Sequence, residues 1–556
     1  MIDKKAFVAN VMNNNTPHPL TNNIPSNAEH ILGRETELKS IATLLSMNKL
    51  TILVNGIGGM GKTSVATKFI ALYGHAYQYI GWVTVQKNLV DAFINHSILL
   101  DSLDIGKKVQ DLVASQQSDK AFECIMHQLN LLEKTLIVID NANNLADLLE
   151  YKHLFDNTSC HFIITSRNRP LEWATVPIES LPNHEAVELF KSLAPSIVSN
   201  KVVNKPTDTD IENLLSKLYF HTLLIELVAK AVGSSGISFG EINAMIETKF
   251  IHHEELSEEI VSTGRHGDSL AENAKRTNIE NYIWLIFNQV TGLSETSKDI
   301  LRGMSLLPLA MGFERKELKD FFEVMGIKDI VHPLAILVER GWLDKEDGEK
   351  ATYKMHPLIA DVVIKHLGVN ATFADAYINH TARLIHYSNI NPEHDLFTIN
   401  KNKPFAERLS DLFFEDNTEE VSELLGNLGY LAESFGFYQK SADLKERALE
   451  IAEMIFDKNH STVAVRQSNL ANVYSDLGRY DKAAELLETA LESAEKNFGK
   501  DHPTVAVSQS NLAWVHKNIG QDARAKELWQ SAYQNYLNNL GAEHPHTISF
   551  KQWSEM

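Results

Sequence analysis

The sequence has few cysteines, no long apolar run and a shortage of positive charge. Its two cysteines in 556 residues, Cys124 and Cys160, exclude a disulfide framework and make a reducing cytoplasm the simplest setting. No apolar stretch reaches the length of about 18 residues that a membrane span needs, and no signal-peptide core is present. We therefore expect a soluble, cytoplasmic protein without a membrane partner. Lys and Arg number 52 against 72 Asp and Glu, and this net charge of −20 argues against a nucleic-acid partner.

The sequence also shows no obvious hydrolytic or metal centre. No Ser-His-Asp or Cys-His arrangement and no zinc-ligand spacing stands above background. His252 and His253 open a charged stretch that extends to Arg276, but no further ligand cluster lies nearby. We interpret this stretch as a long solvated loop rather than as a metal site.

The most informative feature is a glycine-rich loop that fits the pattern G-x-x-x-x-G-K-[ST]. An apolar run at residues 50–54 precedes it, and helical spacing follows as far as residue 73. Glycines let consecutive N–H groups curl around a phosphate, and the following helix presents its positive end to the same anion. Lys62 would reach the β- and γ-phosphates, and Thr63 would bind Mg²⁺; an ordinary glycine turn is the alternative. The residues expected to bind phosphate are Gly56, Gly58, Gly59, Met60, Gly61, Lys62, Thr63 and Ser64.

Short apolar runs alternate with helical patterns between residues 33 and 169. The runs lie at residues 50–54, 79–85, 136–139 and 161–165. Such alternation predicts a parallel sheet covered by helices, and continuous apolar strands fit burial on both faces. The glycine-rich loop would then lie at the carboxyl end of a strand, where sheets of this class bind ligands.

The middle of the chain predicts two further structural units. Residues 181–250 are dominated by helical patterns. Between residues 279 and 366, helices are followed by two short strand-like pieces, 341–344 and 352–356. This helix–helix–hairpin order is of the winged-helix type. Because the segment is not strongly basic, we favour a structural or regulatory role over DNA binding.

The C-terminal third repeats at an interval of 42 residues, since 478 − 436 and 520 − 478 both equal 42. Each unit contains two helical patterns, which predicts a stack of helical hairpins with a concave, partner-binding face. The glycines suit turns between helices, and the alanines suit close helix contacts. The histidines are interpreted as turn or capping residues rather than ligands. The equivalent positions are Gly436, Gly478 and Gly520; Ala448, Ala490 and Ala532; His460, His502 and His544; and Asn469 and Asn511.

These patterns divide the chain into six segments. Residues 1–29 are interpreted either as a mobile tail or as a strand docked on the next domain. The other segments are a nucleotide-binding domain at 30–180, a helical lid domain with the charged loop at 181–278, a winged-helix-like domain at 279–368, a helical linker at 369–420 and the repeats at 421–556.

Several landmarks follow one another in the order that a known family shows. They are Leu32-Gly33-Arg34-Glu35, the glycine-rich loop, the run at 136–140, the run at 163–167, Met355-His356-Pro357-Leu358 and the repeats. Together they resemble the STAND signal-transducing ATPases of the NB-ARC type, and the C-terminal units resemble tetratricopeptide repeats of the kinesin-light-chain kind. The resemblance covers residues 30–550. It implies an α/β P-loop NTPase domain followed by a helical domain, a winged-helix domain and an all-α tetratricopeptide-repeat solenoid.

The resemblance implies catalytic roles for residues near the phosphates. Asp140 would hold Mg²⁺ together with Thr63, although an Asp after a strand can also cap a helix. Asn141 stands where the family usually has a second acidic residue, so we expect slow hydrolysis and a long-lived switch state. Arg167 resembles the sensor arginine that contacts the γ-phosphate; a surface arginine is the alternative.

The resemblance also implies contacts with the rest of the nucleotide. Gly33 and Arg34 match a segment that packs near the adenine, with ordinary loop residues as the alternative. His356 matches the histidine that holds the β-phosphate of ADP and ties its domain to the nucleotide, although a structural histidine would also fit. Thr222 replaces the proline of the family's G-L-P-L segment, so its contact with adenine is in doubt.

Proteins of this kind are nucleotide-switched sensors. ADP locks a closed monomer, and sensing of a ligand with exchange for ATP and Mg²⁺ opens it into a homo-oligomer that activates an effector. In prokaryotes they resemble immune receptors, including phage-defence systems. Here we expect a protein or peptide-like trigger on the concave face of the repeats. Because the chain lacks a recognisable N-terminal effector, its output would be a partner in trans or a filament. A related transcriptional regulator and a repeat scaffold with a vestigial nucleotide site are the alternatives.

Overall fold

The computed structural model describes residues 17–21, 24–25, 31–47, 49–86, 88–115, 117–167, 173–195, 205–234, 238–250, 279–284, 286–287, 293–309, 311–346, 350–386 and 396–555. The chain divides into two compact units, the first made of Met1–Val113 and Gln117–Val369, the second of Ala114–Gln116 and Asn370–Met556. The charged stretch predicted as a loop at 252–276 and most of segment 1–29 lie outside the described residues.

The first unit contains a six-stranded parallel sheet with the order β1-β3-β4-β5-β2-β6. Its strands are β1 (His18–Pro19), β2 (Thr51–Asn55), β3 (Tyr79–Thr84), β4 (Thr135–Asp140), β5 (His161–Ser166) and β6 (Ala174–Pro177). The four predicted strands and the parallel sheet are confirmed. β1 and β6 were not predicted, because strands of two and four residues carry too little pattern. The pairing of His18 with Tyr79 supports the docked-strand interpretation of the N-terminal segment.

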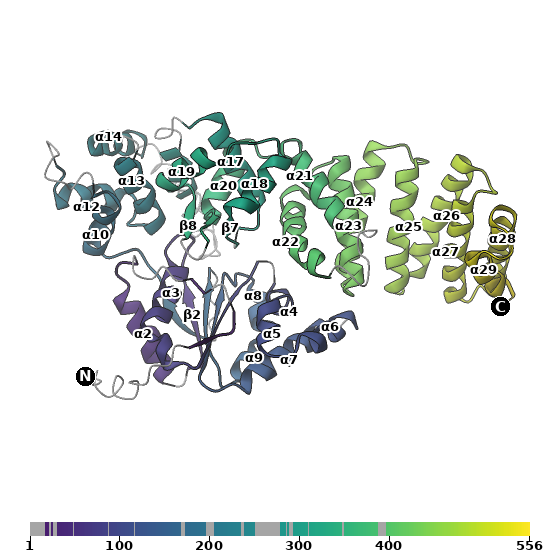
Figure 1. Ribbon diagram of the computed structural model, residues 1–556, viewed down its shortest axis with the longest axis horizontal. Helices are drawn as coiled ribbons and strands as arrows, with labels where there is room; N and C mark the ends of the chain where they lie inside the picture. The colour runs from purple at the N-terminus through teal and green to yellow at the C-terminus, as the bar shows by residue number, and fades with distance from the viewer. Residues whose placement is uncertain are drawn as a thin grey trace, which may run out of the picture. The chain divides into compact units, whose positions relative to one another are not determined.

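Helices lie on both sides of this sheet, with α2 and α3 on one side and α4, α5 and α7 on the other (Figure 1). The glycine-rich loop joins β2 directly to α3, so that the helix starts at Lys62. Val65 and Phe69 of α3 are buried against the sheet together with Val54. The helices of this part are α2 (Glu35–Ser46), α3 (Lys62–Tyr73), α4 (Leu89–Ile94), α5 (Ser97–Ser102), α6 (Gly106–Ala114), α7 (Ser118–Asn130), α8 (Leu145–Glu150) and α9 (Lys152–Asp156), with the 3₁₀ turn η2 (Gly74–Ala76).

A group of helices, which we call the lid, follows the sheet in the described part of the chain. It consists of α10 (Asn183–Leu193), α12 (Asp208–Lys217), α13 (Thr222–Ser234) and α14 (Phe239–Phe250), so the helical prediction for residues 181–250 is confirmed. The chain enters α13 through Tyr219 and Phe220, which both have positive φ, 53° and 50°. The Phe220 N–H donates to the Leu215 carbonyl, and the Phe220 carbonyl accepts from Leu181. This tight turn fixes where residues 221–223 lie.

The hairpin region completes the first unit. It consists of α17 (Glu295–Leu306), β7 (Phe313–Glu314), α18 (Arg315–Val324), α19 (Val331–Glu339), β8 (Asp344–Glu346), β9 (Thr352–Lys354) and α20 (Pro357–His366). The three strands form an antiparallel sheet with the order β7-β9-β8. The predicted hairpin is therefore present, but its first strand starts at Asp344 rather than at Gly341. Gly341 has a φ of 79° and turns the chain, so that Trp342 is buried.

The described residues of the second unit form helices and the turns between them. Its helices are α21 (Ala371–Leu384), α22 (Leu396–Phe413), α23 (Glu419–Ser434), α24 (Tyr438–Ile455), α25 (Ser461–Asp476), α26 (Tyr480–Phe498), α27 (Pro503–Ile519), α28 (Asp522–Leu540) and α29 (Pro545–Glu555). From α23 onward they form a row of antiparallel pairs (Figure 1).

The recurring glycines and alanines, and two of the three recurring histidines, have the structural roles that were predicted for them. Gly436, Gly478 and Gly520 all have φ between 71° and 85° and lie at turns between helices, where only glycine adopts such angles freely. Ala448, Ala490 and Ala532 are almost completely buried between helices. His460 and His502 cap α25 and α27 through their side chains. The predicted solenoid of helical hairpins is confirmed.

Candidate phosphate-binding site

The glycine-rich loop lies at the carboxyl end of β2, between its two neighbours β5 and β6. Two of its glycines are required by the backbone, because Gly59 and Gly61 have φ of 74° and 88°. A third is required by space, since a Cβ at Gly56 would lie 2.6 Å from the Ile178 carbonyl oxygen. The surrounding fold thus fixes the conformation of the loop. A flexible glycine turn, the alternative interpretation, would not need such constraints.

Lys62 bends back over the loop. Its ammonium group donates to the carbonyl oxygens of Gly56 at 2.7 Å and Ile57 at 2.8 Å. Burial, and then the charge of Arg167, lower the pKa of Lys62 to about 8, while Asp140 acts in the opposite direction. The group therefore remains mostly charged at neutral pH and lies where it can meet an anionic ligand held by the loop.

The next loop carbonyls are held by the segment that starts α13. His221 Nε2 lies 2.9 Å from the Gly58 oxygen, and the Leu223 N–H donates to the Gly59 oxygen at 3.2 Å. His221 is 2% exposed, and burial lowers its pKa to about 4. Because a carbonyl can only accept, the neutral ring carries its proton on Nε2.

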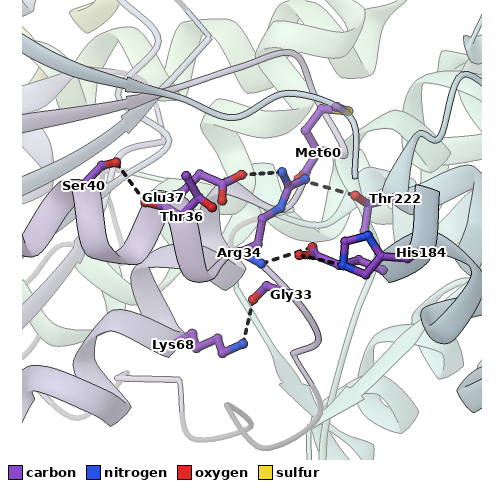
Figure 2. A network of polar contacts seen from close by, with 10 residues as sticks. Gly33, Arg34, Thr36, Glu37, Ser40, Met60, Lys68, His184 and Thr222 are labelled. Carbon is purple, nitrogen blue, oxygen red and sulfur yellow. Dashed lines mark hydrogen bonds and ion pairs between the residues drawn. The ribbon is translucent and has the colours of Figure 1, made fainter. Parts of the chain in front are cut away.

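The fifth loop carbonyl, that of Met60, is held by Arg34. The Arg34 Nη2 atom donates to the Met60 oxygen at 2.9 Å, and Nη1 pairs with Glu37 at 2.7 Å. Figure 2 shows this guanidinium beside Met60 and Thr222. The Thr222 hydroxyl is 3.5 Å from the same oxygen, a marginal contact. Arg34 is 4% exposed, and its guanidinium group contacts the Met60 carbonyl and Glu37. It therefore stabilises the backbone of the loop.

Gly33 stands next to this contact. It has a φ of 73°, and a Cβ there would lie 2.0 Å from Glu185 Oε2 of the lid. Its carbonyl accepts from the Lys68 ammonium at 2.6 Å, as drawn in Figure 2. Gly33 therefore joins α3 to the lid beside the loop.

Thr63 and Asp140 lie together, as the sequence predicted. The Thr63 hydroxyl donates to the Asp140 carboxylate at 3.0 and 3.3 Å, and the Thr165 hydroxyl donates to it at 2.5 Å. Burial raises the pKa of Asp140, while the two hydroxyl groups and the ammonium groups of Lys62 and Lys354 lower it. One carboxylate and one hydroxyl beside a phosphate loop fit the hard oxygen ligands of Mg²⁺, which keeps most of its waters and uses phosphate oxygens. Thr63 and Asp140 are the residues that would hold it.

Asn141 is placed differently from a general base. It has a φ of 66°, and its side chain donates to the Val85 carbonyl at 3.0 Å and accepts from Asn143 at 2.6 Å. Its N–H donates to the Thr165 hydroxyl at 2.8 Å. These contacts hold Asn141 to the chain after β3 and to β5, and an amide side chain is not a general base. Slow hydrolysis stays a prediction.

Arg167 follows β5 at the same edge of the sheet. Its N–H donates to Asn143 at 2.8 Å, and its carbonyl accepts from Asn55 at 3.0 Å. The charge of its guanidinium lowers the pKa of both Lys62 and His356. This position suits a contact with the terminal phosphate of a nucleotide.

His356 approaches the loop from the hairpin region. It caps α20, where its Nδ1 accepts from the Leu358 N–H at 3.2 Å. Burial, followed by the electrostatic effects of the neighbouring His221 and Arg167 side chains, lowers the pKa of His356 to about 3, so the ring is neutral. Since Nδ1 accepts, the proton lies on Nε2, which can donate to a phosphate oxygen. The Leu358 side chain packs on Gly58, 3.3 Å from the position of a Cβ there.

Three residues of this site were not predicted from the sequence. His221 lies in the segment that was noted only for Thr222, and a histidine in place of the family's leucine was the available signal. Thr165 was included in a strand without a role. Lys354 pairs with Glu346 on the hairpin and acts on both Asp140 and His356, but an alternating lysine in a strand gives no signal. Ser64, predicted at the site, lies in the first turn of α3.

A loop–helix phosphate site at the carboxyl edge of a parallel sheet, with an Asp at the end of β4, one strand beyond the neighbouring β5, defines a P-loop NTPase domain. Residues 34–205 match the family profile of the NB-ARC domain, and residues 420–496 and 463–538 match that of the tetratricopeptide repeat. The chain therefore combines an NB-ARC domain with C-terminal tetratricopeptide repeats.

Several solved structures are similar to this chain. A STAND protein with a tetratricopeptide repeat sensor from Pyrococcus horikoshii is 15% identical over 94% of this chain and 86% of its own, with a TM-score of 0.38. A Walker-type ATPase of Pyrococcus abyssi is 17% identical over 62% and 99%, with a TM-score of 0.30. Kinesin light chain-like repeats of Podosopora anserina are 20% identical over 32% and 82%, with a TM-score of 0.28. All three TM-scores are below 0.5, so the class rests on the two family profiles.

The described residues contain neither a helix that could span a membrane nor a cluster of metal-binding side chains. None of the helices there is both long and apolar enough to cross a membrane. Nor do His, Cys, Asp and Glu side chains in that part of the chain gather into a group of three that could hold a metal ion by themselves.

Proposed function

We propose that this chain is a nucleotide-switched signalling ATPase. ADP or ATP with Mg²⁺ binds at the glycine-rich loop, and the repeats sense a protein or peptide-like trigger. Triggering exchanges ADP for ATP, and the chain forms a homo-oligomer that activates an effector in trans. Cytoplasmic antiphage immunity in a prokaryote is the setting that we propose.

One observation carries this proposal. Three separate parts of the first unit meet at the glycine-rich loop: the sheet supplies Asp140, the lid supplies His221, and the hairpin region supplies His356. A nucleotide bound there would lie beside Asp140 and His356 and would depend on the lid through the loop backbone that His221 holds, while Leu358 of the hairpin region packs on the same loop. Because a ligand shifts a conformational equilibrium only through different contacts in the two states, this is the arrangement that a nucleotide switch needs.

The repeats support a protein partner. Val465 and Val507, 42 residues apart on the first helices of their pairs, are 54% and 45% exposed. Tyr430 and Trp514, on equivalent turns of first helices, are also exposed. Large exposed apolar side chains at equivalent places on the first helices of the repeats are of the kind that contacts a protein or peptide.

The test uses the purified full-length chain. It is denatured, any released nucleotide is identified by chromatography, and the native sample is examined by light scattering before and after addition of ATP and Mg²⁺. We expect bound ADP on a monomer and a larger species after the addition. A monomer that neither carries nor binds any nucleotide would refute the proposal and favour the repeat scaffold with a vestigial site.

A further inference from the structure

His221 is a buried histidine whose hydrogen bonding is incomplete. Its Nε2 donates to the Gly58 carbonyl, while its Nδ1, which is fully buried, has no partner among the described residues. Burying an unpaired acceptor destabilises a fold. A leucine of similar size would avoid this cost, so the contact with Gly58 calls for a reason other than stability.

That contact determines how the backbone of the loop is oriented. None of the described peptide bonds is cis, so the carbonyl and the N–H of each peptide plane point in opposite directions. The carbonyls of Gly58 and Gly59 are held by His221 and by the Leu223 N–H. The N–H groups of Gly59 and Met60, which belong to the same two planes, therefore point away from the lid.

The next peptide plane continues this pattern. Arg34 holds the Met60 carbonyl, so the N–H of Gly61 is likewise directed away from Arg34. Within the described part of the chain, nothing accepts a hydrogen bond from the N–H groups of Gly59, Met60 and Gly61. Three consecutive free N–H groups at the start of a helix form a nest for an anion.

The glycine at position 59 makes this arrangement possible. Its φ of 74° turns the loop, and a Cβ there would lie 2.6 Å from the His221 ring and 3.1 Å from the Leu223 side chain. The ring therefore lies directly on the backbone that it orients. Because Phe220 and Tyr219 hold the chain in a tight turn just before it, the ring has little freedom to leave.

We propose that His221 is a positioning residue for nucleotide binding: by holding the Gly58 carbonyl it aims the Gly59 N–H at a bound diphosphate, so that docking of the lid sets the affinity for phosphate. This inference rests on the proposed function. It makes the lid part of the phosphate site without a direct contact to the ligand. Opening of the lid would free the loop carbonyls and release the diphosphate.

The test compares two probes that share only their phosphates. Affinities for ADP and for inorganic pyrophosphate, the second by competition, are measured on the full chain as wild type, His221→Leu, His221→Gln and His516→Leu. The leucine removes the donor at similar volume, and the glutamine amide restores one. His516 is a buried histidine of the repeats, 7% exposed, and serves as the matched control.

We expect His221→Leu to weaken the binding of both ADP and pyrophosphate about tenfold. This corresponds to the loss of one hydrogen bond to a charged group, that from the Gly59 N–H to the diphosphate. His221→Gln should recover most of this loss, and His516→Leu should match the wild type. Circular dichroism confirms that the variants are folded.

Two outcomes would overturn the inference while leaving the proposed function intact. In one, His221→Leu binds ADP and pyrophosphate like the wild type. In the other, it loses affinity for ADP alone, which would mean that His221 acts on the base or on lid closure and not on the phosphate nest. A wild-type protein that binds neither probe would refute the proposed function itself.

Discussion

The two units of this chain differ in whether their side-chain contacts recur along the sequence. In the repeats, one contact is used again and again: Asn497 and Asn539, 42 residues apart, both donate from their side chains to the carbonyl of the loop that precedes the neighbouring helix. The contacts around the phosphate loop, in contrast, do not recur at a fixed interval in the sequence. Arg34, Asn141, Tyr219 and Phe220 have positive φ there, and among the described residues the non-glycine residues with positive φ all belong to the first unit.

This difference separates stability from function. Repeated contacts add up along the solenoid, so each one matters mainly to the stability of its neighbours. Strained backbone, a buried unpaired nitrogen and titratable groups with shifted pKa are costly, and they gather where a ligand or a switch can use them. The predictions below test whether the two units can be disturbed separately.

The largest expected effect is on stability, at Trp529 in the repeats. This side chain is 2% exposed and packs edge-on against Trp514, with ring centroids 5.1 Å apart. Trp529→Ala should lower the free energy of unfolding by about 3–5 kcal/mol, measured by chemical denaturation. Trp514→Ala, at a side chain that is 42% exposed, should cost much less. A changed ADP affinity in Trp529→Ala would show that the two units are not separable.

Lys62→Ala should have the converse effect. Loss of the ammonium group removes a charge-assisted contact with the phosphates and should weaken ADP binding on the order of 100-fold or more, measured by isothermal titration. Unfolding of the repeats should not change. Lys517→Ala, an exposed lysine of the repeats paired with Asp522, is the control. Affinity within a few-fold of the wild type would remove Lys62 from the site.

His356→Ala should act on the switch. Losing the Nε2–H donor should weaken ADP binding roughly tenfold, and the protein should form oligomers without its trigger because the tie between α20 and the loop is lost. ADP dissociation rates and light scattering measure the two effects. His332→Ala, at an exposed histidine of α19, is the control. A His356→Ala protein that is normal in both assays would contradict the role proposed for this residue.

The smallest expected effect is that of pH, which should change the free energy of unfolding and the affinity for ADP in opposite directions. The pKa of Lys62 is about 8 in the folded protein against a reference of 10.5, so the unfolded state binds more protons between these values. The contribution of Lys62 to the free energy of unfolding therefore rises from pH 8 to 10.5. ADP affinity should instead fall, by about five- to tenfold between pH 7 and pH 9, as the ammonium group loses its proton. Lys62→Arg should abolish this pH dependence of binding; an equal slope in that variant would assign it to another group.

The sequence predicted the features that depend on local pattern. Four strands, the phosphate loop, the helical lid and the repeats follow from apolar periodicity and glycine spacing over a few residues. Asp140, Arg167 and His356 were placed near the loop only through the family resemblance, because each follows a separate element. β1 and β6 were missed, since short edge strands have no pattern of their own, and the start of β8 was placed three residues early because the apolar Trp342 and Leu343 are buried outside the strand.

The sequence by itself determined that this chain has a phosphate loop, a parallel sheet and a solenoid of helical hairpins, because these arise from interactions between residues close in the chain. Only the tertiary structure decided how the loop is held. The Gly58 carbonyl and His221 are separated by 163 positions, and the Asp140 carboxylate and Thr63 by 77. Contacts over such distances leave no periodic trace, because they depend on how lid, sheet and hairpin region pack, and it is these contacts that turn a common loop into this particular site.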